Sequence, residues 1–403
     1  METSAQTDVP TMRVINNKSF GFSGKGGEYF SIWIVNICLT IVTLGIYSAW
    51  AKVRNNQYFY GNTQLDGASF QYLATPIQIL KGRIVAFAIF GLLGALNSFM
   101  PLLGAVFWGV IILLLPAIIT MSMSFRMRYT AYRNVNFGFH QSFGGAYYAL
   151  GLPVLVIAGY MVSIGAMGAL VSAQAPGDPV EPGTAVMVAG GITAVFALLL
   201  FTLYPLFDFV LTRFLAANTK YGVSNFQYTA TAKDFYKLYG KVLGMSLLVA
   251  LLIGVVMAIA LPAGMSGMMA AGAANQAPIA SPKPGLMMVI MAPLMLFYLW
   301  LFAYIKVKRS NLIFSHIKVG EHQLQSELEI VRMAWLYISN TLLIMFSFGL
   351  ATPWALIRAA HYHLSCTSLD VMGELIDFTA DQQQQQSSIG QEIGDVFDLD
   401  IAL

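Results

Sequence analysis

Polar side chains inside apolar segments are the residues of this sequence that could do chemistry. Asp208 lies in the segment TLYPLFDFVLTRF, and Asn36 and Asn340 lie in the middle of two other apolar segments. Polar groups are costly in lipid, and those found there commonly serve a solute, ion or proton pathway. Asp208 could bind or relay a cation, or it could form an interfacial ion pair with Arg213. The two asparagines could bind a solute, or they could hydrogen-bond between helices.

Two glycines mark breaks in the segments that carry the asparagines. Gly45 lies in TLGIYSAW and Gly349 lies in SFGLATPW. In the second segment Thr352-Pro353 has the pattern of an N-cap followed by proline at the first helical position. We therefore expect helix, break and helix in each segment. Non-helical backbone at membrane depth is tolerated where it is buried in protein or lines a wet cavity, so each break is either a packed kink or part of a path.

Tryptophan and arginine recur together after each break. Trp50 and Trp354 precede Arg54 and Arg358 by four residues, which puts each pair on one helix face. Tryptophan is enriched at the membrane interface, and arginine there contacts the headgroup region. We interpret the four residues as interface anchors, and a cation–π gate is the alternative.

Enzyme chemistry has little support in the sequence. The glycine-rich SGKGGE (23–28) lacks the spacing of a phosphate-binding loop. His361 and His363 are two residues apart, so they do not share a helix face as metal ligands would. No predicted membrane span contains a Ser-His-Asp order, a H-E-x-x-H motif or a pair of carboxylates. The sequence therefore predicts no catalytic residue, no metal and no cofactor, and an enzyme is disfavoured.

The composition indicates which elements must position the polar residues. Of the 403 residues, 57% are hydrophobic and 10% are charged, whereas about 25% of a soluble domain is charged. This excludes a soluble enzyme and predicts a polytopic membrane protein. Apolar blocks that meet or exceed the length of a membrane span, about 20 residues, are Tyr29–Ala51, Ile84–Phe125, Gly144–Phe207, Val242–Ile305 and Met333–Ile357.

The lengths of these blocks predict the fold class. Each of the three middle blocks is long enough for a helical hairpin. We predict an all-α polytopic membrane protein with six full transmembrane helices in three hairpins, flanked by two broken, re-entrant helical elements. Small cytoplasmic β-hairpins are also expected, because alternating aromatic residues beside Asp66-Gly67 are a hairpin signal. The alternative is eight full spans with both termini outside.

Lysine and arginine predict the orientation. The connections 52–83, 126–143, 213–241 and 306–332 contain 17 of the 22 basic residues. Cytoplasmic loops carry the excess of Lys and Arg, so we place these connections and both termini in the cytoplasm. The same charges are expected to attract anionic lipid headgroups, and the membrane context makes nucleic acid an unneeded partner.

Internal similarity and composition divide the chain into three parts. Residues 36–66 align without gaps on 340–370, with ten of 31 positions identical. We predict a cytoplasmic N-terminal segment (1–28), a membrane domain with internal repeats (29–378) and a disordered, Gln-rich acidic tail (379–403). The tail is a candidate for docking a protein partner.

Three motifs near the N-terminal end carry a resemblance to a known family. The strings FGFSGKGGEYF (20–30), NICLTIVTLGIYSAWAKVR (36–54) and YFYGNTQLDG (58–67) resemble the YjgN family of bacterial inner-membrane proteins. The likeness covers about residues 14–380. It implies a location in the inner membrane of a Gram-negative bacterium, and it implies no activity.

Two function classes follow from these observations. The leading hypothesis is a small-solute transporter or channel that uses the paired broken helices. The alternative is a non-transporting membrane scaffold, lipid-binding or regulatory protein. The two differ in whether Asn36, Asn340 and Asp208 face a common wet cavity or pair off separately in a dry core.

Overall fold

The computed structural model describes residues 15–172, 184–272 and 284–397. Residues 1–14 of the predicted N-terminal segment and residues 398–403 of the predicted tail lie outside the described residues. The same is true of residues 173–183 and 273–283.

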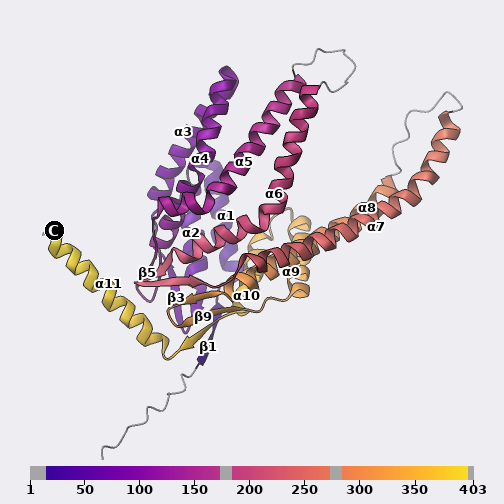
Figure 1. Cartoon of the computed structure of the whole chain (residues 1–403). Helices are drawn as coiled ribbons and strands as arrows, with labels where there is room; N and C mark the ends of the chain where they lie inside the picture. The colour runs from indigo at the N-terminus through magenta and orange to yellow at the C-terminus, as the bar shows by residue number, and fades with distance from the viewer. Residues whose placement is uncertain (1–14, 173–183, 273–283, 398–403) are drawn as a thin grey trace, which may run out of the picture.

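Ten short antiparallel strands form a closed barrel (Figure 1). The strands are neighbours in the order β1-β10-β9-β8-β7-β6-β5-β4-β3-β2, so each strand pairs with the strands next to it in the chain and β1 pairs with β10. Their bounds are β1 (Ile15–Phe22), β2 (Thr63–Leu65), β3 (Ala68–Tyr72), β4 (Thr130–Tyr132), β5 (Val135–Phe139), β6 (Thr219–Tyr221), β7 (Ser224–Tyr228), β8 (Ile317–Val319), β9 (His322–Ser326) and β10 (Thr367–Met372).

Helical hairpins connect the strands at one rim of the barrel. One hairpin lies between β1 and β2, and others follow β3, β5, β7 and β9, which gives five strand–helix–helix–strand units. The helices are α1 (Gly26–Val42), α2 (Ser48–Asn62), α3 (Pro76–Phe99), α4 (Pro101–Arg128), α5 (Phe143–Ser172), α6 (Thr184–Ala217), α7 (Ala232–Gly272), α8 (Pro284–Phe314), α9 (Ile330–Phe346), α10 (Thr352–Ser365) and α11 (Leu375–Phe397).

Tight two-residue turns connect the strands at the opposite rim. Asp66 and Gly67 between β2 and β3 have φ of 48° and 72°, and Arg133 and Asn134 between β4 and β5 have φ of 46° and 61°. Two positive φ values are the type I′ geometry that matches the twist of a hairpin. Gly222 supplies the positive φ in the next hairpin.

The predicted fold class, an all-α protein with six full transmembrane helices, is wrong. Only small separate β-hairpins were expected beside the helices, whereas the strands close into one barrel. In the described part of the chain, five helices rather than six are long and apolar enough to cross a membrane: α3, α6 and parts of α4, α5 and α7. All strands except β1 and β10 have three or five residues, too few to show a clear alternation, so the barrel had no strong signal in the sequence.

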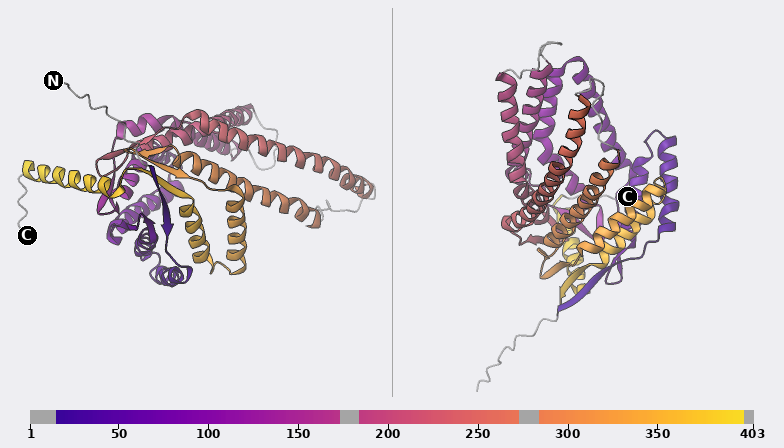
Figure 2. Two further views of the ribbon diagram at one scale, coloured as in Figure 1. Left: turned by 90° about the horizontal axis from the view of Figure 1, so that it is seen from below. Right: turned by 90° about the vertical axis from the view of Figure 1, so that its right-hand side faces the viewer.

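The helices and strands occupy different levels of the molecule (Figure 2). The long helices α3 to α6 stand side by side above the strands, and α7 and α8 leave the same rim at an angle to them (Figure 1). Large apolar side chains on these helices are exposed, including Phe87, Leu198 and Leu251. Such surfaces suit hydrocarbon, because an exposed helix in lipid has no reason to bury its apolar face.

Side chains from every strand fill the inside of the barrel. Eight buried residues form one cluster, and partly buried aromatic and aliphatic residues pack against it. Side chains of strands on opposite sides of a closed barrel can form one cluster only in its interior. The strand residues of this cluster are Phe20, Leu65, Ala68, Phe70, Tyr132, Val135, Phe137, Tyr221, Phe226, Val319, Leu324, Leu369 and Val371.

The first turns of α11 close the rim that carries the tight turns. Leu375 joins the interior cluster, and Phe378 contacts the rings of Tyr221 and His322 at centroid distances of 6.1 and 4.5 Å. Gln382 accepts hydrogen bonds from the backbone N–H groups of Val223 and Ser224 at 2.9 and 3.1 Å. Helix α11 continues from this anchored base to Phe397, so it includes residues 379–397 of the predicted tail.

Candidate functional site: polar clusters where the helices meet the barrel

A buried ion pair joins helices of two neighbouring hairpins. Asp208 of α6 accepts hydrogen bonds from Nε and Nη2 of Arg309 in α8, with Nε–Oδ2 at 2.8 Å and Nη2–Oδ1 at 2.6 Å. Tyr239 of α7 donates its hydroxyl to the same carboxylate at 2.8 Å. The side chain of Asp208 is 7% exposed and that of Arg309 is 36% exposed. The bidentate geometry is the strongest form of this contact and fixes the angle between the two groups.

The partner of Asp208 differs from the one expected from the sequence. Arg213 was the candidate, but the carboxylate bonds Arg309, which is 101 residues away in the chain. Arg213 lies on an exposed part of α6. Residues five apart on a helix point in different directions, so the sequence spacing did not favour that pair. A nearby phenol, Tyr228 of β7, has a buried hydroxyl without a partner among the described residues.

Asn36 forms its polar contacts within the first helical hairpin. Its Nδ2 donates to Oδ1 of Asn55 in α2 at 3.0 Å, and its Oδ1 accepts a long 3.5 Å contact from Nη1 of Arg54. A cavity of about 220 Å³ lies beside this amide pair and is also lined by Trp33, Thr40 and other residues of α1 and α2.

Asn340 likewise forms its polar contacts within its own hairpin, the last one, and shares with Asn36 the contact to an arginine 18 residues on. Its Nδ2 donates to the carbonyl oxygen of Ala355 at 3.1 Å, and its Oδ1 accepts from Nη1 of Arg358 at 3.0 Å. The arginine that was assigned only to headgroups therefore also bonds the buried amide. The two asparagines lie in neighbouring hairpins, since α1 packs on α10, but each uses partners of its own hairpin.

Both predicted helix breaks are present at the expected glycines. Leu44 and Gly45 have φ of 48° and 93°, and Phe348 and Gly349 have φ of 51° and 89°. The side chains at these tips are almost fully exposed, 94% for Leu44 and 96% for Phe348. An apolar residue held out at a tip suits an apolar environment. The re-entrant placement of the two hairpins in the membrane stays a prediction.

The predicted anchors have aromatic and polar neighbours. Trp50 stacks on Tyr47 with ring centroids 6.1 Å apart, and Trp354 lies against Phe30 at 5.0 Å. Arg54 donates to the hydroxyl of Tyr47 at 3.0 Å. Among the described residues, neither tryptophan stacks on the arginine four residues after it. A cation–π contact there is formed instead by Arg133 over the ring of Tyr132. Their role as anchors remains a prediction.

A charged triad joins β1 to the β2–β3 turn and the β4–β5 turn at the rim of tight turns. Asp66 contacts Nζ of Lys18 at 2.9 Å and Nη2 of Arg133 at 2.9 Å. The hydrogen bonds from these two cations lower the pKa of the Asp66 carboxyl below its ordinary value. Burial lowers the pKa of His322 at the same rim, where its Nδ1 accepts from the backbone of Met372 at 3.1 Å. This rim is built for structural closure.

The structure brings together some predicted residues and separates others. Asn36 meets Arg54, and Asn340 meets Arg358, whereas Asp208 belongs to a separate cluster on α6, α7 and α8. Sequence reasoning missed Arg309 and Tyr239, which no local pattern marks. It also missed the pairing of each asparagine with its arginine, although the repeat keeps both residue types at the same spacing of 18.

The family comparison decides what this chain belongs to. A family model described as "Bacterial protein of unknown function (DUF898)" matches residues 17–396. The chain belongs to this family. No solved structure matches it.

Two curated proteins that are similar to this chain are inner-membrane proteins. The Inner membrane protein YjgN of Salmonella typhimurium (strain LT2) is 35% identical over 144 residues, which are 35% of this chain and 36% of the relative. The Inner membrane protein YjgN of Escherichia coli (strain K12) is 28% identical over 226 residues, 55% of this chain and 53% of the relative. The matched region thus spans about half of the relatives' length or less.

These relatives and the apolar helices agree on location. The chain is an integral, multi-pass protein of the bacterial inner membrane. The resemblance to the YjgN family is confirmed by both comparisons.

Proposed function

We propose that this DUF898 member is a non-transporting membrane scaffold that binds lipid at the face of the membrane where its barrel lies. The observation that carries the proposal is the filled barrel interior, to which all ten strands contribute side chains. A barrel of this kind is a packed core rather than a pore. It is suited to hold five helical hairpins at fixed positions around a ring.

The placement of the polar residues supports the same proposal. Asn36, Asn340 and Asp208 each have hydrogen-bond partners, and those partners belong to different clusters. Polar groups that pair off in this way act as contacts between helices. A common wet cavity would instead leave several of them turned toward one space.

The distribution of charge supports lipid contact on the barrel side. The four connections that contain 17 of the 22 basic residues also contain the strand pairs β2–β3, β4–β5, β6–β7 and β8–β9. An excess of Lys and Arg favours the cytoplasmic face, where the leaflet is anionic. In this proposal the barrel and both ends of the chain are cytoplasmic, and the acidic tail is the segment that docks a protein partner.

A small-solute transporter is the second candidate. The cavity of about 220 Å³ beside Asn36 and Asn55 supports it, because amides there could bind a polar solute next to a helix break at Gly45.

A reconstitution experiment separates the two candidates. The purified chain is placed in liposomes, and entry of small uncharged and charged solutes is followed by osmotic swelling. We expect swelling no faster than in protein-free liposomes. Swelling that the wild type causes and that Asn36→Leu abolishes would overturn the scaffold proposal and favour transport. Leu39→Ala, an exposed position on the same helix, is the control.

A further inference from the structure

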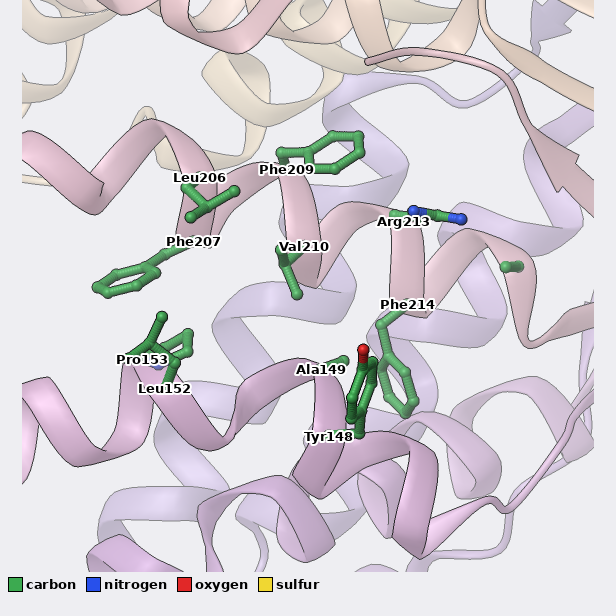
Figure 3. Close-up of a pocket in the computed structure, with 11 residues that line it drawn as sticks. Tyr148, Ala149, Leu152, Pro153, Leu206, Phe207, Phe209, Val210, Arg213 and Phe214 are labelled. Atoms are coloured by element: carbon green, nitrogen blue, oxygen red, sulfur yellow. The ribbon is translucent and has the colours of Figure 1, made fainter. Parts of the chain in front are cut away.

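An apolar pocket lies between α5 and α6, next to the rim of the barrel (Figure 3). Its volume is about 450 Å³. Leu206 and Phe207 of α6 face Leu152 and Pro153 of α5 at one end, and Tyr148 and Phe214 lie at the other. The pocket is part of the helix surface that is exposed to the bilayer, since Tyr148 is 94% exposed and Leu152 is 53% exposed.

The sequence explains why the two helices leave a gap here. Pro153 lies inside α5 and Pro205 lies inside α6, and proline within a helix removes a hydrogen bond and bends it. Beyond the gap the two helices come close together at Gly159. A Cβ at this position would clash with the ring of Phe196, so the close approach depends on glycine. Toward the barrel, Phe214 packs edge-on against Phe139 at 5.9 Å. The pocket is therefore bounded at both ends by protein.

A single cation marks the barrel end of this pocket. Arg213 lines the pocket and is exposed. Its guanidinium has no hydrogen bond or ion pair with the described residues. The nearest carboxylate along the helix, Asp208, is already held by Arg309 on the other side. Arg213 lies four residues before the end of α6 at Ala217, so it is at the level where the helices leave the bilayer.

We infer that this pocket is a binding site for an anionic phospholipid, with an acyl chain between α5 and α6 and the headgroup phosphate on Arg213. This inference rests on the proposed function and assigns a place to the lipid. An apolar pocket alone selects nothing in a bilayer, because lipid tails are as apolar as the helices. The guanidinium of Arg213 can pair with the headgroup phosphate in bidentate geometry. In phosphatidylcholine the positive choline group offsets the charge of the phosphate. The single cation Arg213 therefore favours a phospholipid whose headgroup has a net negative charge.

Lipid titration of single variants tests the inference. The full chain in detergent micelles is titrated with phosphatidylglycerol or with phosphatidylcholine of the same acyl chains, and bound lipids are counted by native mass spectrometry. Arg213→Gln is expected to weaken the tightest phosphatidylglycerol site about fivefold, the usual contribution of one basic residue at an anionic surface. Phosphatidylcholine binding should change little. Arg213→Lys should retain most of the preference for phosphatidylglycerol.

Two further variants make each outcome decisive. Arg126→Gln removes another exposed cation of the same level, on α4 and outside the pocket, and should leave the tightest site unchanged. Val210→Trp fills the apolar part of the pocket and should weaken both lipids. Equal losses in Arg213→Gln and Arg126→Gln would overturn the site and leave lipid binding in place. A wild type that binds phosphatidylglycerol no better than phosphatidylcholine would overturn the inference as well. A wild type that binds neither of the two lipids would overturn the proposed function itself.

Discussion

At the scale of single residues, the buried polar groups of the apolar segments form hydrogen bonds and ion pairs with other groups of the protein. Asp208 was the most conspicuous polar residue of the apolar segments, and it is fully engaged by Arg309 and Tyr239. The sequence could predict that this carboxylate needs a partner, because burial of an unpaired charge is costly. It could not identify the partner, since Arg309 is 101 residues away and only the packing of α6 on α7 and α8 brings it close.

The ion pair predicts a large loss of stability for a one-sided change. Asp208→Asn leaves the guanidinium of Arg309 without its charge partner, and breaking such a pair costs about 3 kcal/mol when one side is partly exposed. We expect that loss in the free energy of unfolding, measured by denaturant titration in mixed micelles. Arg213→Gln, on the same helix but without an ion pair, should change it by less than about 0.5 kcal/mol. Equal effects of the two variants would contradict the assignment of the pair.

The triad at Asp66 predicts a pH dependence of barrel stability. The pKa of Asp66 is lowered by Lys18 and Arg133 below its ordinary value of 3.8. A carboxylate with a lowered pKa in the folded state stabilises the fold above the ordinary pKa, and that contribution is lost as the pH falls through the lowered value. In thermal unfolding, the midpoint temperature of the wild type should therefore fall as the pH drops below 3.8 and through the lowered pKa, and the curves of the wild type and Asp66→Asn should converge below that lowered pKa. Asp377→Asn, an exposed carboxylate on α11, should follow the wild type throughout.

At the scale of elements, turn and break signals were readable and strand pairing was not. Asp66-Gly67 carried a hairpin signal, and the structure has a two-residue turn there. Gly45 and Gly349 marked the ends of helices correctly. Strands of three residues, such as β2, pair because the preceding helix delivers them to a neighbour. That information lies in the tertiary arrangement rather than in local propensity.

Two glycines of the first hairpin separate the effect of backbone conformation from that of packing. A Cβ at Gly45 or at Gly61 meets nothing within 4 Å, but Gly45 has a φ of 93°. Gly45→Ala should lower the free energy of unfolding by about 1–2 kcal/mol, because a left-handed conformation is unfavourable for a residue with a Cβ. Gly61→Ala, inside α2, should be neutral or stabilise by up to about 1 kcal/mol. Both are measured by the same micelle titration, and a stabilising Gly45→Ala would contradict the conformation of the break.

At the scale of the whole molecule, the ring of five units determines which parts share a side of the membrane. Every strand lies at one level, and β1 and the docked turns of α11 are both part of that level. The segments 36–66 and 340–370 fall on equivalent elements of two adjacent units, joined where β1 pairs with β10. The sequence predicts β-hairpins and basic connections as separate features. It could not predict that the connections close into one barrel, because closure depends on all five units at once.

Single-cysteine labelling tests the sidedness. In a background of Cys38→Ser and Cys366→Ser, one cysteine is placed at Ser19 in β1 or at Asp377 in α11, both exposed positions. A membrane-impermeant thiol reagent should label neither in intact inner-membrane spheroplasts, and both after permeabilisation. Thr184, exposed at the far end of α6, should show the opposite pattern when replaced by cysteine. Labelling of Ser19 and Asp377 from different sides would contradict the barrel itself.

The closure of the barrel also has a consequence for how the chain is made. The pairing that closes the barrel joins β1 to β10, and Asn17 in β1 donates to Asp370 in β10 at 2.7 Å across 353 residues of sequence. A growing chain can insert its helical hairpins one after another, while the strands between them wait with an open edge. Such edges are templates for wrong pairing, and contacts of long sequence separation form slowly. Closure of the barrel therefore waits until β10 has been made: a chain truncated before β10 keeps the described helical hairpins on an unsealed ring.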